Sequence, residues 1–186
     1  GAVFNAYTNT FADSIIVRNS NIHDNYRGFA LAEEKEENGL YNAEVVVFDN
    51  TIFRAITQWA IDYTRLGSDE STTGGSLTIN HCVFDEVNDR EDQTIIRQQG
   101  IKHIAISNTL FMNSSAKWVV RLMGPGQNAQ NCNVYLCGKI GVFVGAKAEN
   151  ILEIKPKFQK NSYLAHPKSA LLKAATDGQS IGIIVH

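Results

Sequence analysis

Short apolar runs alternate with polar bends along the chain, and one eight-residue pattern recurs four times without gaps. The four copies cover residues 16–23, 46–53, 77–84 and 104–111, and a weaker fifth copy covers 131–136. In each copy an apolar, often β-branched run leads into a polar bend and then a second apolar run, which predicts two short strands joined by a turn. Because one such unit cannot bury its apolar face alone, we expect a solenoid of stacked coils.

Two columns of the repeat predict how the coils stack. The fourth position is polar and suits a bend, because Asn, Asp and Ser tolerate left-handed backbone angles. Its members are Asn19, Asp49, Asn80 and Ser107. The seventh position is always aliphatic, and its members are Ile22, Ile52, Val83 and Leu110. Stacking puts like residues above like, so we expect an outer polar ladder and an aliphatic column inside the coils.

The spacing between copies indicates the fold class. Successive members of the aliphatic column are 30, 31 and 27 residues apart. An antiparallel sandwich, the alternative all-β fold, would show hairpin turns every ~8–12 residues. We therefore predict an all-β, right-handed, single-stranded parallel β-helix of about four to five coils. It is expected to form a single domain, residues 1–186, with repeat coils over about 14–145 and an irregular C-terminal cap over about 146–186.

Segments outside the repeated strands predict a cap and a variable face. Residues 169–175 are expected to form one short helix that covers the open end of the solenoid, where strand edges would otherwise be unpaired. Polar insertions cover residues 33–37, 67–75 and 85–92. Insertions in solenoids tend to gather on one face, often the binding face.

Composition narrows the class of partner. The formal net charge is −2, so no basic excess indicates nucleic acid or an anionic membrane as a partner. No apolar run approaches the ~20 residues needed to cross a bilayer, and no membrane span is expected. Cys82, Cys132 and Cys137 are expected to be buried free thiols, unless the last two pair across adjacent turns. The leading Gly1 without Met suggests that the chain begins inside a longer protein.

Residues 62–84, which include the run Asp-Glu-Ser-Thr-Thr-Gly-Gly at 69–75, resemble polysaccharide lyase family six, the family of alginate lyases and chondroitinase B. The ending, residues 166–182, is similar to that of many pectin-lyase-like β-helix proteins. The resemblance is to the second, C-terminal β-helix of two-domain members rather than to their catalytic first helix. It implies a bacterial protein that is secreted, periplasmic or held at the cell surface.

The chemistry that the resemblance implies is β-elimination on uronate sugars. In the family a Lys acts as base and an Arg as acid, while calcium neutralises the substrate carboxylate. These groups lie on the first helix, and none of the lysines before residue 147 sits in a strand copy beside an Arg and an acidic cluster. We therefore assign no catalytic residue and expect no cofactor in this chain, with calcium a feature of the parent lyase.

Three arginines are the candidate substrate-binding residues. Arg65, Arg97 and Arg121 are the last residues of the second-strand segments 63–65, 95–97 and 119–121, so we expect them to form one column with a coil spacing of ~4.8 Å. Such a ladder, if it points outward, would hold uronate carboxylates by bidentate hydrogen bonds. The alternative is a structural charge ladder balanced by acidic neighbours such as Asp62.

Other polar and aromatic residues have weaker candidate roles. Asp69 and Glu70 are candidate calcium ligands, because calcium prefers oxygen donors, or they cap their loop and pair with an arginine. His81, in the polar bend, is expected to make a ladder hydrogen bond. Trp59 and Trp118 either stack on sugar faces or pack in the core. The sequence contains no Gly-rich phosphate loop, HExxH motif or nucleophile elbow.

The predicted function is that of an accessory β-helix in a lyase acting on uronate-containing polysaccharide, such as alginate or a chondroitin-like chain. Alone, the chain is expected not to cleave polysaccharide. Its expected partners are an acidic polysaccharide, the N-terminal catalytic β-helix of the same protein and, in a homodimer, a second copy. One rival is a compact lyase that uses the three-arginine face and a nearby base. The other is a structural or interaction module without glycan affinity.

Overall fold

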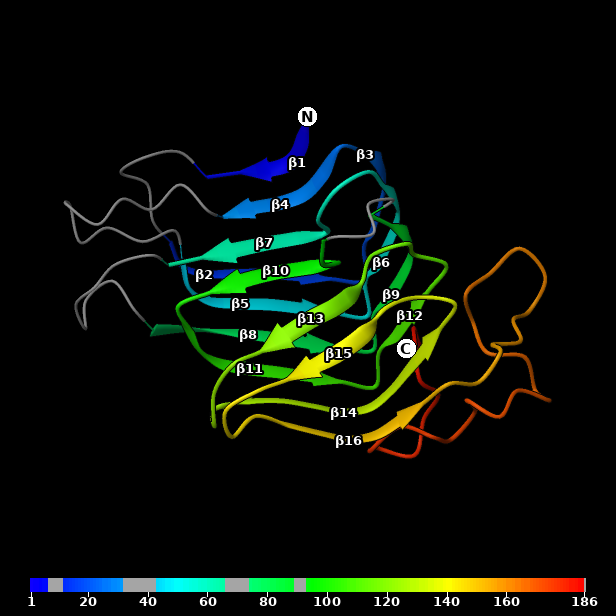
Figure 1. The fold of residues 1–186 in the computed structure, drawn as a ribbon. Helices are drawn as coiled ribbons and strands as arrows, with labels where there is room; N and C mark the ends of the chain where they lie inside the picture. Colours follow the sequence, from blue (N-terminus) through cyan, green and yellow to red (C-terminus); the bar gives the residue numbers. More distant parts are fainter. Residues whose placement is uncertain (7–11, 32–42, 66–73, 89–92, 186) are drawn as a thin grey trace.

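The computed structural model describes residues 1–6, 12–31, 43–65, 74–88 and 93–185, and it shows stacked coils of parallel strands (Figure 1). Every pairing between its strands is parallel. The described residues contain no helix. Each pass of the chain adds a strand to each face, and the predicted all-β parallel β-helix is thereby confirmed.

The strands form three sheets. In spatial order, the first consists of β1 (Ala2–Asn5), β4 (Arg27–Leu31), β7 (Ile61–Thr64) and β10 (Ile96–Gln99). The second consists of β2 (Ala12–Arg18), β5 (Ala43–Asp49), β8 (Gly74–Asn80), β11 (Ile101–Ser107), β14 (Gln127–Tyr135), β12 (Leu110–Met112), β9 (Val83–Val87), β6 (Ile52–Ile56) and β3 (Asn21–Asn25), with β16 (Lys147–Leu152) paired to β14. The third consists of β13 (Trp118–Leu122) and β15 (Lys139–Val142). The long strand β14 joins both faces of the second sheet, so that sheet bends around a corner.

That corner is built from residues with left-handed backbone angles, one in each coil. We call it the asparagine corner; its members are Asn19, Asn50, His81, Asn108, Asn131 and Asn150. Their φ values lie between 48° and 52°, a region that Asn visits more readily than most residues. Side chains also bond from coil to coil, as Asn50 Nδ2 donates to Asn19 Oδ1 at 2.8 Å. The corner fixes where each coil turns.

The strand register corrects the alignment of the repeat by one residue. Arg18, rather than Asn19, lies beside Asp49, and Asp49 lies beside Asn80. In coils two to four the predicted polar residues, Asp49, Asn80 and Ser107, are therefore the last residues of the first strand. The residue with a left-handed backbone comes directly after each of them. A polar ladder does form there, with Asn80 Nδ2 donating to Asp49 Oδ1 at 3.1 Å and Ser107 Oγ donating to Asn80 Oδ1 at 2.9 Å.

An aromatic column, rather than the predicted aliphatic one, fills the interior beside the corner. Phe53, Phe84 and Phe111 are fully buried and stack in register, with ring centroids 4.7 and 4.9 Å apart. The prediction that the aliphatic column lies inside is wrong for three of its four members. These members, Ile52, Val83 and Leu110, point outward and pack in a separate apolar cluster with the C-terminal segment. The fourth, Ile22, lies inside in register with the phenylalanines.

The C-terminal segment runs back along the coils instead of covering the open end. The predicted helix over 169–175 is wrong, because these residues form turns. Residues 174–184, which we call the strap, cross the asparagine corner coil by coil. Its docking bonds include Asn131 Nδ2 to the Ala174 carbonyl at 2.9 Å and the Ile184 amide to Asn50 Oδ1 at 2.8 Å. The outer column is buried by this strap.

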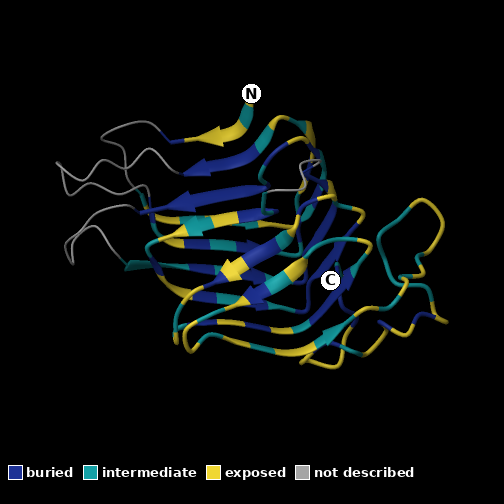
Figure 2. Cartoon of the chain, viewed as in Figure 1, coloured by how far each residue is buried: buried dark blue, intermediate teal, exposed yellow. Residues whose placement is uncertain are grey.

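Burial differs along the sheets (Figure 2). Strand β7 is buried at every position and β4 at all but its first, whereas β13 and β15 each contain exposed as well as buried residues. The lower coils of the first and third sheets therefore present side chains to solvent. This surface holds the candidate site.

Candidate functional site

Two of the three candidate arginines lie together on this surface. Thr94 pairs with Trp118, which aligns Arg97 on β10 with Arg121 on β13 in the next coil. Both arginines line a pocket of about 310 Å³ whose other walls include Trp59. Arg97 and Arg121 thus form the outward pair that the sequence predicts.

Arg65 does not belong to this column. Register places Asp62, and not Arg65, beside Arg97, because β7 starts four residues before Arg65. The Arg65 side chain is buried, and its guanidinium lies 3.3 Å from a carboxylate oxygen of Glu44 on β5. Its backbone amide donates to the Gln99 carbonyl at 2.8 Å. Arg65 therefore has a structural environment and offers no guanidinium to the pocket.

A buried carboxylate and an indole ring hold Arg97. Its Nε donates to Asp62 Oδ1 at 2.6 Å, and its guanidinium carbon lies 4.1 Å from the centre of the Trp59 ring. Burial raises the pKa of Asp62 despite the opposing effect of the Arg97 charge. Because about half of the Arg97 side chain stays exposed, its outer N–H groups face solvent in a fixed orientation.

Trp59 contacts a second arginine as well. The Arg27 guanidinium carbon lies 5.1 Å from the Trp59 ring, and Arg27 Nε donates to Gln58 Oε1 at 2.7 Å. The Trp59 indole thus positions two guanidinium groups, and stacking of this ring on sugar stays a prediction. Trp118 makes an edge contact with Phe143, 6.1 Å between centroids.

Arg121 lies where two pockets meet. Its guanidinium carbon is 5.3 Å from the centre of the Phe143 ring, and Gln98 Nε2 donates to its carbonyl at 2.5 Å. Gln98, Gln99 and Arg121 line both the smaller pocket and a larger neighbour of about 760 Å³. We call the two together the basic groove.

The larger pocket adds two more basic side chains, Lys102 and His103, both exposed. Apolar walls come from Ile101, Met123 and Pro125. Every ionisable side chain among the described residues that line the groove is basic, and none carries a carboxylate. The groove thus offers several cationic donors to an anionic ligand.

The other predicted site residues fall elsewhere. Asp69 and Glu70, the candidate calcium ligands, lie outside the described residues. Within the described part of the chain, no three His, Cys, Asp or Glu side chains gather in a way that would hold a metal ion. All three cysteines are free, and burial raises the pKa of each thiol to about 12, which makes them unreactive.

No protein-family model and no curated protein matches the chain. Among the described residues no helix is long and apolar enough to span a membrane.

Sequence reasoning missed two basic residues of the groove. Lys102 and His103 follow a turn at Gly100 and meet Arg121 only because coils stack, and their order along the chain carries no such signal. The pairing of Arg97 with Asp62 agrees with the alternative of a charge ladder balanced by acidic neighbours, although the sequence does not show which arginine Asp62 meets, because that depends on strand register. Aligning the second strands on their apolar residues, with the arginines left free, would have revealed it.

Proposed function

We propose that this chain is a β-helix module that binds an acidic, uronate-containing polysaccharide along the basic groove. The observation that carries the proposal is the pair Arg97 and Arg121 on adjacent coils of a groove whose described lining contains no carboxylate. Strand spacing sets successive coils ~4.8 Å apart, close to the length of one sugar unit. In a polyuronate such as alginate, carboxylates on neighbouring sugars can therefore meet neighbouring coils.

The two arginines contribute differently to binding. Arg97 is preorganised by Asp62 and Trp59, so little side-chain entropy is lost when it binds a ligand. Arg121 is exposed and, within the described residues, has no ion-pair partner, so its fork of donors is open to a bidentate carboxylate. The resemblance to polysaccharide lyase family six supports uronates as the ligand class.

The same resemblance supports a role as the C-terminal accessory region of a bacterial, exported lyase. In that setting the partners are the polysaccharide, the N-terminal catalytic β-helix of the same protein and a second copy in a homodimer. Calcium would belong to the parent lyase. The module would hold or guide the chain while cleavage takes place elsewhere.

Calorimetry tests the binding directly. A guluronate or chondroitin hexasaccharide at low ionic strength should release heat, and an uncharged cello-oligosaccharide should not. Arg121→Gln should weaken binding roughly tenfold, because a charge-assisted bidentate contact is lost. Arg18→Gln, which alters an exposed arginine at the far end of β2, should leave binding unchanged.

Raising the salt concentration should weaken the wild-type complex, because exposed charge pairs are screened. Absence of heat at millimolar uronate would contradict the proposal and favour a purely structural module. Equal losses in Arg121→Gln and Arg18→Gln would place the binding outside the groove.

A compact lyase is the second candidate, and one observation favours it. Lys102 and His103 line the same pocket as Arg121, so a base lies near a carboxylate-binding group. Ultraviolet absorbance of unsaturated uronate would reveal turnover after mixing chain and polysaccharide. If it rises, and His103→Ala abolishes the rise, the chain is itself a lyase.

A further inference from the structure

His81 is the single departure from Asn in the asparagine corner. The other five members of that column are Asn19, Asn50, Asn108, Asn131 and Asn150. His81 shares their left-handed backbone, with φ of 48°. Since Asn satisfies this conformation in every other coil, the backbone alone does not call for an imidazole at this position.

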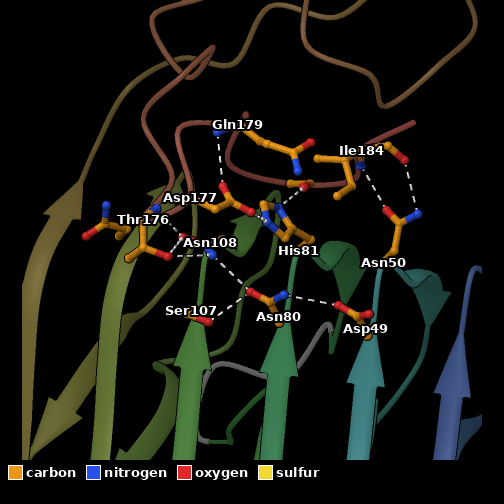
Figure 3. A network of polar contacts seen from close by, with 12 residues as sticks. Asp49, Asn50, Asn80, His81, Ser107, Asn108, Thr176, Asp177, Gln179 and Ile184 are labelled. Carbon is orange, nitrogen blue, oxygen red and sulfur yellow. Dashed lines mark hydrogen bonds and ion pairs between the residues drawn. The ribbon is translucent and has the colours of Figure 1, made fainter. Parts of the chain in front are cut away.

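The His81 ring is enclosed between the coil and the strap (Figure 3). Its Nε2 lies 2.9 Å from Asp177 Oδ2, and its Nδ1 lies 3.1 Å from the Gly182 carbonyl oxygen. The His81 side chain is 2% exposed and that of Asp177 is 42% exposed. Both nitrogens therefore face strap atoms that accept hydrogen bonds.

Two acceptors define which form of the ring fits. A neutral imidazole carries one N–H and can donate to only one of them, which leaves a lone pair facing an oxygen. An imidazolium donates to both. Burial opposes the charge, and the adjacent carboxylate favours it. The docked strap thus matches the doubly protonated ring.

The ionisable groups around this contact agree with that assignment. Burial raises the pKa of Asp177, but hydrogen bonds from the Gln179 amide and from His81 outweigh it, so its pKa lies below the usual value. Asp49, one coil away, bonds to Asn80, and Lys173 precedes the strap. The Cys82 thiol is neutral, because burial raises its pKa to about 12.

We propose that His81 and Asp177 form a proton-dependent latch, which holds residues 177–184 on the asparagine corner while His81 is charged and releases them as the ring loses its second proton. Imidazole is the side chain that ordinarily changes charge between about pH 5 and 8, so release should accompany a rise in pH. Release uncovers Val83 and Leu110 of the outer apolar column, because the strap covers them. The corner bonds outside this stretch, such as Asn131 to Ala174, stay in place.

Amide hydrogen exchange of the full chain tests the latch. The amides of Gly182 and Ile184 donate to Asn108 O and Asn50 Oδ1, so they exchange only when the strap opens. Their protection factors, which remove the intrinsic pH dependence of exchange, should fall about tenfold or more between pH ~5.5 and ~8.5, because a charged hydrogen bond is lost. The Ile104 amide, bonded to Gly126 O between coils, serves as the internal reference and should not change.

His81→Asn restores the residue of the other coils and removes the titrating group, so its strap protection should be independent of pH. In Asp177→Asn, the strap protection at acidic pH should fall to the value that wild type shows at alkaline pH. If neither variant folds, ¹⁵N shifts of the wild-type imidazole report the charge directly, and both nitrogens should be protonated in the docked state. A pH-independent wild type, a pH-dependent His81→Asn, or a singly protonated docked ring would overturn the proposal.

Discussion

The asparagine corner and the basic groove are both polar, yet they satisfy their polar groups in opposite ways. At the corner, Asn50 makes two hydrogen bonds to Ile184 and Asn108 bonds to Thr176, so strap and coils complete each other. In the groove, Arg121 is exposed and, in the described part of the chain, has no carboxylate partner. Polar groups that bond to one another stabilise the fold, whereas a polar group without such a partner is available to a ligand. Substitutions at the corner should therefore change stability, and those in the groove should change binding.

Leu110→Ala should give the largest effect. Leu110, on β12, is fully buried against the C-terminal segment, so truncation should lower the free energy of unfolding by ~2–4 kcal/mol. Urea denaturation measures this, and Leu136→Ala is the control because Leu136 is 67% exposed. Equal losses in the two variants would mean that the C-terminal segment does not cover the outer column.

Asn108→Gly should have an intermediate effect. Glycine keeps the left-handed backbone but removes bonds to Asn80 and Thr176, which should cost ~1–3 kcal/mol of unfolding free energy. Asn150→Gly is the matched control, since Asn150 has nearly the same φ, is exposed and bonds only to Asn131 among the described residues. Uronate binding should be unchanged in both. A loss of uronate binding in Asn108→Gly would contradict the assignment of stability to the corner and of binding to the groove.

Asp62→Asn should have the smallest effect and should act on binding. Without the carboxylate, Arg97 loses its fixed orientation, and uronate affinity should drop roughly threefold. Burial raises the pKa of Asp62, so the folded chain binds this proton more tightly than the unfolded chain. The free energy of unfolding therefore falls as pH rises through the raised pKa of Asp62, and Asp62→Asn should remove that pH dependence. Urea denaturation at about pH 4 and 7 checks the sign; a steeper dependence in the variant would contradict it.

The fold can be predicted from the sequence because the same types of residue recur at a regular spacing. Apolar runs every 27 to 31 residues require stacking, and the polar bend between them marks the turn. The sequence alone does not show which side chains of the second strand point into the core and which point outward. Ile52 and Phe53 are adjacent and both apolar, and only the strap, far away in sequence, makes an apolar residue suitable on the outer side.

The candidate site was predicted in part for a related reason. Arg97 and Arg121 occupy equivalent places in adjacent coils, as their positions after apolar pairs suggested. Arg65, which follows Tyr63 and Thr64, lies beyond the end of β7 and is buried. Local pattern cannot distinguish these cases, because register depends on where each strand begins. The C-terminal turns were mistaken for a helix because Ala and Leu favour helices, whereas docking on the corner determines their conformation.

Binding of an acidic polysaccharide in the basic groove is the central claim, and amide chemical shifts recorded during titration with a uronate hexasaccharide test it most directly. The account predicts saturable changes at Gln98, His103 and Arg121, with Gly182 and Ile184 of the strap unaffected. Changes confined to the strap, or none anywhere at millimolar ligand, would contradict it.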